Sequence, residues 1–418
     1  MFPKYYVLDQ LLEKHKTELD LKDYFIISVQ HLMRSTGSLF ETLLEWGINP
    51  KHIFLTGKIY SAHQETIEKI KQLEINVKTP TIPVELGYYA NYLEKDVLDL
   101  WKELEKVLTP NAKIIVLDDG GFALKNVPED ILQKYEVFGI EQTTSGIRLQ
   151  NTFKKFPVIH VASSAAKTII EPPIVSEAVN IQLGDVIKKL KPRTVGIIGY
   201  GNIGKAIAKE FYNEYAITIF DSQNIPKSTL NGNFNFSKSI EDLYKKSDVI
   251  IGATGKDISD INWLIDSNSD KTLISVSSGD IEFNKLIRNC SPYLIDKLES
   301  SLQDLNLKTV NGHSLKILRG GLVANFTGKP DSSPGHIIQM TRGLLFSAII
   351  QIVKEVDVLK NHTGAIALNA LLQKQVVSLW FENQPQRKIE YGNELIKGFK
   401  NVEWIMKRAY RLSNTKLS

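Results

Sequence analysis

Cysteine is almost absent from this sequence: Cys290 is the single example among 418 residues. One cysteine excludes an internal disulfide framework, and it excludes a metal site built from several thiolates. We therefore expect no structural metal and a reducing compartment.

An excess of one charge sign is also missing. The chain carries 51 Lys and Arg against 47 Asp and Glu, for a formal charge of +4. So small a surplus, spread along the chain, argues against a nucleic-acid partner.

Long apolar segments are scarce as well. Residues 1–6 lack the apolar core and cleavage site of a secretory signal. The apolar stretch 343–353 is interrupted by Ser347 and Gln351 and is too short to span a bilayer. We expect no membrane partner and a cytoplasmic location.

What the chain does contain is an alternation of strand-like and helix-like segments before and after residue 176. This pattern predicts an α/β protein with two doubly wound parallel-sheet domains, because 418 residues exceed one comfortable core. We expect a first domain over 1–175, an inserted second domain over 176–328, a return to the first domain over 329–380, and a helical C-terminal extension over 381–418. The pair Gly320 and Gly321 predicts a hairpin turn.

The segment 194–221 is the most informative one. An apolar strand runs into Gly199, Gly201 and Gly204, the G-x-G-x-x-G pattern that makes a tight turn and lets a pyrophosphate approach a helix N-terminus. A second strand ends in Asp221, whose carboxylate suits the adenosine ribose hydroxyls. No arginine follows for a 2′-phosphate, so we expect NAD rather than NADP. The inserted domain over 176–328 is therefore predicted to be a Rossmann NAD domain, and the domain formed by 1–175 and 329–380 to be the substrate domain. The other predicted contacts in this unit are Asn202 and Ile203.

Five phrases together resemble S-adenosylhomocysteine hydrolase, in order and spacing, over roughly residues 31–325. They lie at residues 117–121, 139–149, 167–171, 194–221 and 253–255. The resemblance implies tightly held NAD, transient oxidation of a ribose hydroxyl, elimination of a thiol and addition of water. It implies a homodimer or homotetramer and a nucleoside-like small-molecule substrate.

Residue by residue, the resemblance implies Lys167 as the base, with Glu171 four residues further along a helix. Asp119 and His31 match acid/base positions. By themselves, Lys167 and Glu171 favour an ordinary helix salt bridge over a catalytic pair. The remaining matches are substrate-binding positions at Gln142 and Met33, and cofactor-binding positions at Thr143, Thr144, Ser145, Thr254, Gly255 and Asn325.

Several positions depart from the family pattern. Gln142 replaces a glutamate that binds ribose hydroxyls, Met33 replaces a threonine, and Ala162 and Pro172 replace asparagines. These changes concentrate on ribose and base recognition, so they predict an altered substrate.

Other interpretations remain open. The chain is also consistent with a net NAD-dependent dehydrogenase, either one acting on a nucleoside in a specialised pathway or one of the D-2-hydroxyacid type. Arg319, Glu282 and His313 supply the residue types that the second of these requires. A third interpretation is a non-catalytic NAD-binding regulatory protein that retained the fold.

Overall fold

The computed structural model describes residues 1–147, 155–223, 234–290, 302–326 and 328–384. The C-terminal extension predicted for 381–418 lies outside this part from residue 385 onward. The chain divides into two compact units. Unit 1 consists of Met1–Pro80, Leu93–Glu171 and the chain from Ser333; unit 2 consists of Thr81–Tyr92 and Pro172–Ser332.

The short segment Thr81–Tyr92 belongs to unit 2, which differs from the predicted boundary. Hydrogen bonds explain why. The carbonyl oxygen of Gly87 accepts from Asn284 Nδ2 at 2.8 Å and from Arg288 Nε at 2.9 Å. Asp280 Oδ2 accepts the backbone N–H of Tyr89 at 3.2 Å. A sequence-based boundary has no access to such long-range bonds.

Unit 1 contains a parallel sheet with the strand order β14-β6-β5-β4-β1-β2-β3. The strands are β1 (Tyr24–Leu32), β2 (Ile53–Ala62), β3 (Asn76–Val77), β4 (Lys113–Asp118), β5 (Glu136–Glu141), β6 (Pro157–His160) and β14 (Gly364–Ala367). Nearly every residue of β1, β2 and β4 is buried, as expected for strands covered on both faces. β1, β4 and β5 are neighbours, so their carboxyl ends meet at one edge of the sheet.

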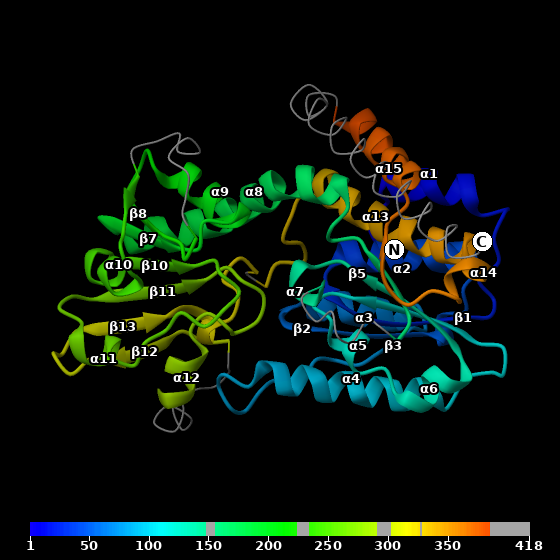
Figure 1. The fold of residues 1–418 in the computed structure, drawn as a ribbon, viewed down its shortest axis with the longest axis horizontal. Helices are drawn as coiled ribbons and strands as arrows, with labels where there is room; N and C mark the ends of the chain where they lie inside the picture. Colours follow the sequence, from blue (N-terminus) through cyan, green and yellow to red (C-terminus); the bar gives the residue numbers. More distant parts are fainter. Residues whose placement is uncertain (148–154, 224–233, 291–301, 327, 385–418) are drawn as a thin grey trace, which may run out of the picture. The chain divides into compact units, whose positions relative to one another are not determined.

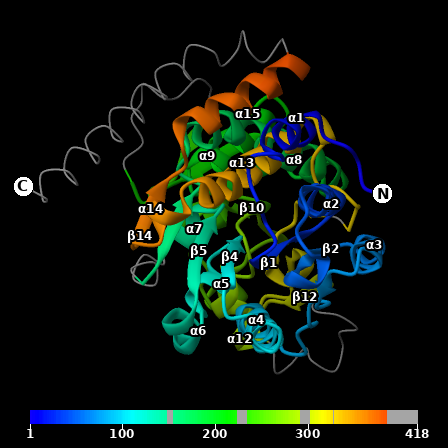
Figure 2. The same ribbon diagram turned by 90° about the vertical axis from the view of Figure 1, so that its right-hand side faces the viewer.

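Helices lie on both faces of this sheet, with α1 and α13 on one side and α4 and α6 on the other (Figure 1). Helices α1, α13 and α15 lie together in Figure 2 and contact one another. The helices of unit 1 are α1 (Tyr6–His15), α2 (Arg34–Trp46), α3 (Gln64–Gln72), α5 (Phe122–Lys125), α6 (Glu129–Lys134), α7 (Thr144–Ile147), α13 (Gly335–Lys354), α14 (Val356–Leu359) and α15 (Ala370–Asn383), with a 3-10 turn η1 (Pro50–His52). Two helices include residues of both units: α4 (Tyr89–Glu105) begins in unit 2, and α8 (Ala165–Leu190) belongs to unit 2 from Pro172 onward.

Helix α13 is apolar around its whole circumference. At 20 residues it is longer than the apolar stretch seen in the sequence, and within the described ranges it is the one helix that passes a length and hydropathy test for a membrane span. Because 89% of its most apolar window is buried inside the protein, it has the character of a core helix.

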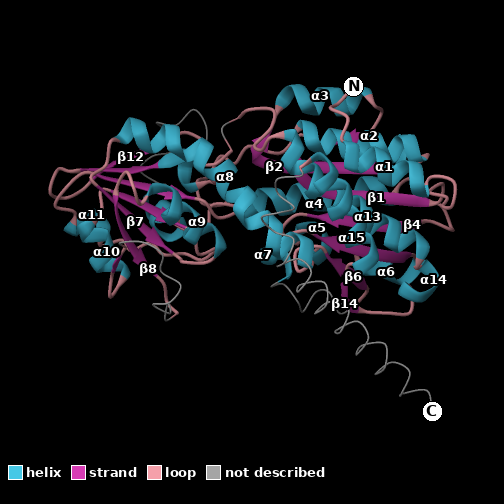
Figure 3. Cartoon of the chain, turned by 90° about the horizontal axis from the view of Figure 1, so that it is seen from above, coloured by secondary structure: helices cyan, strands magenta, loops and turns pink. Residues whose placement is uncertain are grey.

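Unit 2 contains the second sheet, with the order β12-β13-β11-β10-β7-β8-β9. All pairs are parallel except the antiparallel pair β12 and β13. Strand order reverses between β7 and β10, the point at which such sheets bind ligands. The strands, magenta in Figure 3, are β7 (Thr194–Ile198), β8 (Ala216–Phe220), β9 (Asn235–Phe236), β10 (Val249–Gly252), β11 (Lys271–Ser275), β12 (Leu305–Lys308) and β13 (Ser314–Ile317). The helices are α9 (Asn202–Phe211), α10 (Ile240–Lys246), α11 (Trp263–Asp266) and α12 (Asn284–Cys290).

The hairpin predicted at Gly320 and Gly321 is wrong. These residues belong to the 3-10 turn η5 (Leu318–Gly321), with φ values of 61° and 83°. The hairpin turn in this region instead joins β12 to β13. Paired glycines supply positive φ for several kinds of turn, so they did not specify a hairpin.

Candidate functional site

The loop after β7 in unit 2 has the shape of a dinucleotide cradle. Gly199 has φ 98°, and a Cβ there would lie 2.7 Å from the carbonyl oxygen of Ala253. A Cβ on Gly204 would lie 1.9 Å from the carbonyl oxygen of Gly199, so only glycine permits this close packing. A Cβ on Gly201, in contrast, would meet no protein atom within 4 Å. Helix α9 begins directly afterwards at Asn202, where its N-terminal amides favour an anion.

Asp221 lies at the end of β8 beside this loop. Its Oδ2 accepts the backbone N–H of Tyr200 at 2.6 Å, and its Oδ1 accepts the N–H of Gln223 at 2.8 Å. A carboxylate oxygen has a second lone pair, so both oxygens keep capacity for ribose hydroxyls. The residues present therefore fit NAD.

The loop after β10 is held by a fully buried carboxylate. Glu282 Oε1 accepts the N–H groups of Thr254 and Gly255 at 2.6 and 2.7 Å. Burial raises the pKa of Glu282, although these hydrogen bonds oppose the rise. Asn325, near the end of β11, has a buried Oδ1 without a hydrogen-bond partner in the described part of the chain. That atom is free to accept a hydrogen bond from a bound cofactor.

The residue types expected for a D-2-hydroxyacid dehydrogenase do not converge within unit 2. Glu282 contacts the loop at the carboxyl end of β10, whereas the ring of His313 lies 3.8 Å from Asp270, just before the first residue of β11. Because β10 and β11 are parallel, Glu282 lies at the carboxyl ends of the strands and His313 at their amino ends, on opposite sides of the sheet. Arg319 lies in η5 with φ 51° and donates its N–H to Asp304.

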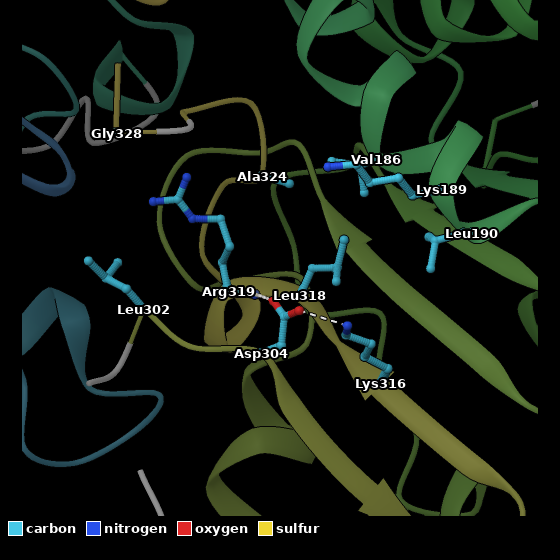
Figure 4. Close-up of a pocket in the computed structure, with 10 residues that line it drawn as sticks. All are labelled: Val186, Lys189, Leu190, Leu302, Asp304, Lys316, Leu318, Arg319, Ala324 and Gly328. Atoms are coloured by element: carbon cyan, nitrogen blue, oxygen red, sulfur yellow. Dashed lines mark hydrogen bonds and ion pairs between the residues drawn. The ribbon is translucent and has the colours of Figure 1, made fainter. Parts of the chain in front are cut away.

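Unit 2 also contains a cavity of about 500 Å³ (Figure 4). The end of α8 and the segment from β13 to Ala324 supply apolar walls, and the charged lining residues are Lys189, Lys316, Arg319 and Asp304. Lys316 pairs with Asp304 at 2.8 Å. None of the predicted cofactor-binding residues lines this cavity, although Asn325 directly follows the lining residue Ala324.

Two of the predicted catalytic residues, His31 and Asp119, lie together in unit 1 with Gln142, which was predicted to bind substrate. His31 Nε2 lies 3.2 Å from Asp119 Oδ2, and Gln142 Nε2 donates a hydrogen bond to the same oxygen. The other oxygen, Oδ1, accepts a hydrogen bond from the ammonium of Lys58. We call these four residues the Asp119 cluster. His31 and Lys58 lie within β1 and β2, and Asp119 and Gln142 directly follow β4 and β5.

The cluster is buried and strongly polarised. Lys58 and Asp119 are each 2% exposed, and His31 is 18% exposed. Burial acts to raise the pKa of Asp119, but Lys58 and His31 outweigh it and hold that pKa well below its usual range. Burial lowers the pKa of His31, and Lys58 lowers it further, against the opposing effect of Asp119. Asp119 is therefore ionised and His31 neutral near pH 7.

Ser61 extends this cluster on the far side of the imidazole. Its Oγ lies 2.5 Å from His31 Nδ1. If Nε2 carries the proton that faces the Asp119 carboxylate, Nδ1 is the acceptor of the Ser61 hydroxyl. Ser61, His31 and Asp119 then form a chain along which a proton can move.

Two further buried carboxyl groups lie behind the cluster. Asp118 and Glu141 are paired residues of β4 and β5, and each is fully buried. Burial raises the pKa of Asp118 to about 6, and burial together with Asp118 raises the pKa of Glu141 well above its usual value. Glu141 Oε1 accepts from the N–H groups of Gly120 and Thr143, so it shapes the loops that carry Asp119 and Gln142.

The other predicted residues of unit 1 occupy nearby loops. Lys167 is 9% exposed on the first turn of α8, and its N–H donates to Ser164 Oγ. The side chain of Glu171 lies outside the described part, so the predicted pair stays a prediction. Thr143 Oγ1 accepts the N–H of Gly146 and lies 3.0 Å from Ser145 Oγ, the geometry of a cap for α7, which begins at Thr144. Met33 is 4% exposed at the N-cap position of α2.

Sequence reasoning missed Lys58 and Ser61. A signal was present for Lys58, because it lies within a strand-like segment, and a lysine is almost never buried in a strand without a partner. No comparable signal marked Ser61, because serine is common at strand ends.

Together, the glycine cradle and its acid define unit 2 as an NAD-binding Rossmann unit, and comparison with known proteins agrees. Residues 175–258 match the family model of the NAD-binding domain of D-isomer specific 2-hydroxyacid dehydrogenases. The chain thus carries a dehydrogenase-type NAD domain, which supports an NAD-dependent oxidoreductase. The match ends before Glu282, Arg319 and His313.

Two curated relatives cover most of the chain. They are the "Uncharacterized protein MT0113" and the "Uncharacterized protein Rv0104" of two Mycobacterium tuberculosis strains, each 25% identical over 380 residues, which is 86% of this chain and 70% of the relative. Among solved structures, the TT0316 protein of Thermus thermophilus is 10% identical, with a TM-score of 0.34 over 78% of this chain and 97% of that one. That likeness is too low to bear on function.

Proposed function

We propose that this protein is an NAD-dependent dehydrogenase that oxidises a secondary alcohol bound at the Asp119 cluster of unit 1. The observation that carries the proposal is the convergence of an ionised Asp119, a neutral His31 and a buried Lys58 in a chain with a dehydrogenase-type NAD domain. The residue types that the D-2-hydroxyacid alternative drew from unit 2 lie at opposite sheet edges, so we assign the proton chemistry to unit 1.

Oxidation of an alcohol to a ketone removes a hydride from carbon and a proton from oxygen. NAD, when bound, supplies the hydride acceptor. The proton passes to His31, directly or through the Ser61 hydroxyl, and the Asp119 carboxylate stabilises the imidazolium that forms. Lys58 acts as a positioning residue, because its ammonium keeps Asp119 ionised and fixes the carboxylate. The Oε1 of Gln142, buried and without a hydrogen-bond partner in the described ranges, is available to accept from a substrate hydroxyl.

Lasting NADH absorbance tests this proposal. The protein is mixed with NAD and, in turn, with 2-hydroxy acids and nucleosides, and we expect NADH to accumulate with one of these classes. His31→Asn should lower kcat about a hundredfold or more while NAD binding stays unchanged, because it removes the proton acceptor and leaves unit 2 intact. A matched Lys167→Ala variant separates the two bases: loss of kcat in Lys167→Ala alone would transfer the base role to Lys167 and refute the assignment to His31.

A second candidate is a transient oxidation of the S-adenosylhomocysteine hydrolase type. The supporting observation is that His31 and Gln142, which match separate positions of that resemblance, both contact Asp119, a third matched position. Thiol release from S-adenosylhomocysteine without lasting NADH would favour this candidate. If NAD binds but neither NADH nor thiol appears with any compound, the non-catalytic NAD-binding alternative gains support.

The expected homodimer or homotetramer and the cytoplasmic location remain proposals. Light scattering of the full chain tests the first, and cell fractionation tests the second.

A further inference from the structure

Two buried carboxyl groups lie side by side next to the Asp119 cluster. Asp118, the last residue of β4, and Glu141, the last residue of β5, are partners in the parallel register, and both are completely buried. Partner residues of neighbouring strands are about 5 Å apart and direct their side chains to the same face of the sheet. Two ionised carboxylates at that separation, away from water, would repel each other strongly.

Each of these carboxyl groups uses one oxygen to hold the chain that follows its strand. Glu141 Oε1 accepts the N–H of Gly120 at 3.2 Å, and it accepts the N–H and the hydroxyl of Thr143 at 2.6 and 2.7 Å. Asp118 Oδ2 accepts the N–H of Leu124 at 2.9 Å. These bonds fix the segments after β4 and β5, and both segments carry members of the Asp119 cluster.

The second oxygen of each carboxyl group is an orphan. Asp118 Oδ1 and Glu141 Oε2 are buried, and neither has a hydrogen-bond partner within the described part of the chain. Gly146, in α7, packs closely over the second of these atoms, since a Cβ there would lie 2.1 Å from Oε2. Carboxylate oxygens only accept hydrogen bonds, but one added proton makes a donor of one oxygen and leaves the other as its acceptor. A single proton therefore satisfies both atoms.

The electrostatics of the pair favour a retained proton. Burial raises the pKa of Glu141 well above its usual value, and the Asp118 carboxylate raises it further, against hydrogen bonds from Thr143. Burial raises the pKa of Asp118 to about 6, although the N–H of Leu124 opposes the rise. Both shifts favour the state in which the pair keeps one proton near neutral pH.

The surrounding charges do not balance two ionised carboxylates. Charged or titratable groups on the elements next to the pair include His31, Lys58, Tyr60, Asp119, His160 and Arg342. Lys58 acts on Asp118, but Asp119 already engages its ammonium. Lys125, on α5, pairs with Glu94 at 2.9 Å. One cation that is shared with Asp119 leaves further buried negative charge costly, so keeping a proton is the more stable state.

We propose that Asp118 and Glu141 share one proton between Oδ1 and Oε2, and that this hydrogen bond positions the two loops that carry Asp119 and Gln142. Asp118 and Glu141 are thus positioning residues. When alkali removes the shared proton, two carboxylates face each other, and their repulsion moves the loops apart. This inference deepens the proposed function and rests on it in one respect, namely that the positioned groups carry out the proton transfer.

Amide substitutions test the shared proton, because an amide presents the acceptor and the donor of a protonated carboxyl group. In Glu141→Gln the nitrogen donates to Asp118, and in Asp118→Asn the nitrogen donates to Glu141. Each single variant should keep the thermal midpoint of unit 1 at or above that of the parent at pH 7. The double variant places two N–H donors face to face, so it should lose about 2–4 °C or more beyond the sum of the single changes. Simple addition of the two changes would overturn the proposal.

Infrared spectroscopy observes the proton itself. A protonated carboxyl group has a C=O stretching band that is separate from the carboxylate bands and shifts in D₂O. We expect this band in the parent at pH 7 and its loss in each single variant, because the partner of each amide is then ionised. Glu129→Gln is the matched control, since the Glu129 side chain is 62% exposed on α6, and it should keep the band. A band that neither Glu141→Gln nor Asp118→Asn reduces would overturn the proposal.

The dependence of stability on pH follows from the same pair. The pKa of Glu141 lies above its unfolded value of about 4.3, so its stabilising contribution is complete in acid and is lost as the pH rises through the folded pKa. Glu141→Gln lacks this titration. Its thermal midpoint should therefore exceed that of the parent by an amount that grows from pH 5 to pH 9, and a constant difference would contradict the shared proton.

The kcat–pH profile tests the positioning role. The parent should lose kcat in alkali, as the loops of Asp119 and Gln142 separate, whereas Glu141→Gln should show no such loss. Glu141→Ala, which cannot bond to Asp118, should lose kcat about tenfold to a hundredfold at every pH, because the reacting groups are misplaced. The glutamine variant should restore most of that loss. An alkaline loss of the same size in the parent and in Glu141→Gln would overturn the positioning role.

The two proposals fail separately. If no alcohol yields NADH, the dehydrogenase is refuted, while the infrared band and the thermal midpoints still decide on the shared proton. If NADH forms but the band and the midpoints do not respond to the amide variants, the shared proton is refuted and the dehydrogenase stands.

Discussion

Replacing Lys58 by methionine removes one half of a buried ion pair and keeps most of the side-chain volume. Lys58 and Asp119 are each 2% exposed, so Asp119 would remain as a buried charge with His31 as its remaining ionisable partner. Breaking such a pair costs about 3–5 kcal/mol. We expect a loss of this size in the unfolding free energy of unit 1 at pH 8.

The loss should depend on pH in a definite direction. In the parent protein the pKa of Asp119 lies below its unfolded value, so its contribution is present throughout the neutral range and is lost only as the pH falls through the folded pKa. Without Lys58, burial dominates and raises that pKa above the unfolded value of about 3.9. The variant is then least destabilised in acid and loses stability as the pH rises through its new folded pKa, so the difference between the proteins should shrink from pH 8 to pH 5.

Urea unfolding followed by tryptophan fluorescence measures this difference at both pH values. Because the chain has two units, added NAD identifies the unit 2 transition by shifting it alone. Lys134→Met is the matched control, since Lys134 is 62% exposed and lies 4.0 Å from Asp130, and a pair of that kind contributes little. A Lys58→Met loss below about 1 kcal/mol, or one equal at pH 5 and pH 8, would refute the buried-pair reasoning.

Four further predictions concern unit 2. Gly204→Ala should destabilise unit 2 and abolish NAD binding in calorimetry, because its Cβ would lie 1.9 Å from a carbonyl oxygen. The control Gly184→Ala on α8, whose Cβ would meet no atom within 4 Å, should leave NAD binding unchanged and keep or slightly raise stability. Equal behaviour of the two variants would contradict the cradle geometry. Gly201→Ala should leave the thermal midpoint unchanged but weaken NAD about tenfold or more, since its Cβ would occupy the path of the pyrophosphate; full NAD affinity would place the pyrophosphate elsewhere. His313→Ala should leave kcat unchanged, because His313 lies at the end of the strands opposite the cofactor loops; a loss of activity would restore the D-2-hydroxyacid assignment of unit 2. Asp221→Ser should weaken the binding of NAD but not of NADP in the same titrations.

The sheets and the cofactor loop were predictable because their signals are local. Buried parallel strands appear as short apolar runs, and Gly199, Gly201 and Gly204 fall at fixed spacing between a strand and a helix. Local signals gave the wrong turn at Gly320 and Gly321. Both residues have the positive φ that paired glycines indicate, but the kind of turn depends on packing in unit 2.

The candidate site of unit 1 was predictable only in part. His31, Asp119 and Gln142 were found through a resemblance in sequence, and the structure brings them together. Lys58 was missed because its partner Asp119 lies 61 residues away along the chain. A long-range pair between two strands of a sheet cannot be identified from a single sequence.

The order of segments along the chain has a consequence for biosynthesis. Unit 2 has all its residues once Ser332 has been made, whereas unit 1 still lacks α13 and β14. A ribosome-bound intermediate at that stage would carry a finished nucleotide-binding unit and an unfinished sheet with β6 at its edge, because β14 pairs there only later. Exposed edges and uncovered apolar faces promote aggregation, so we expect nascent chains of this protein to depend on chaperones until α13 has emerged.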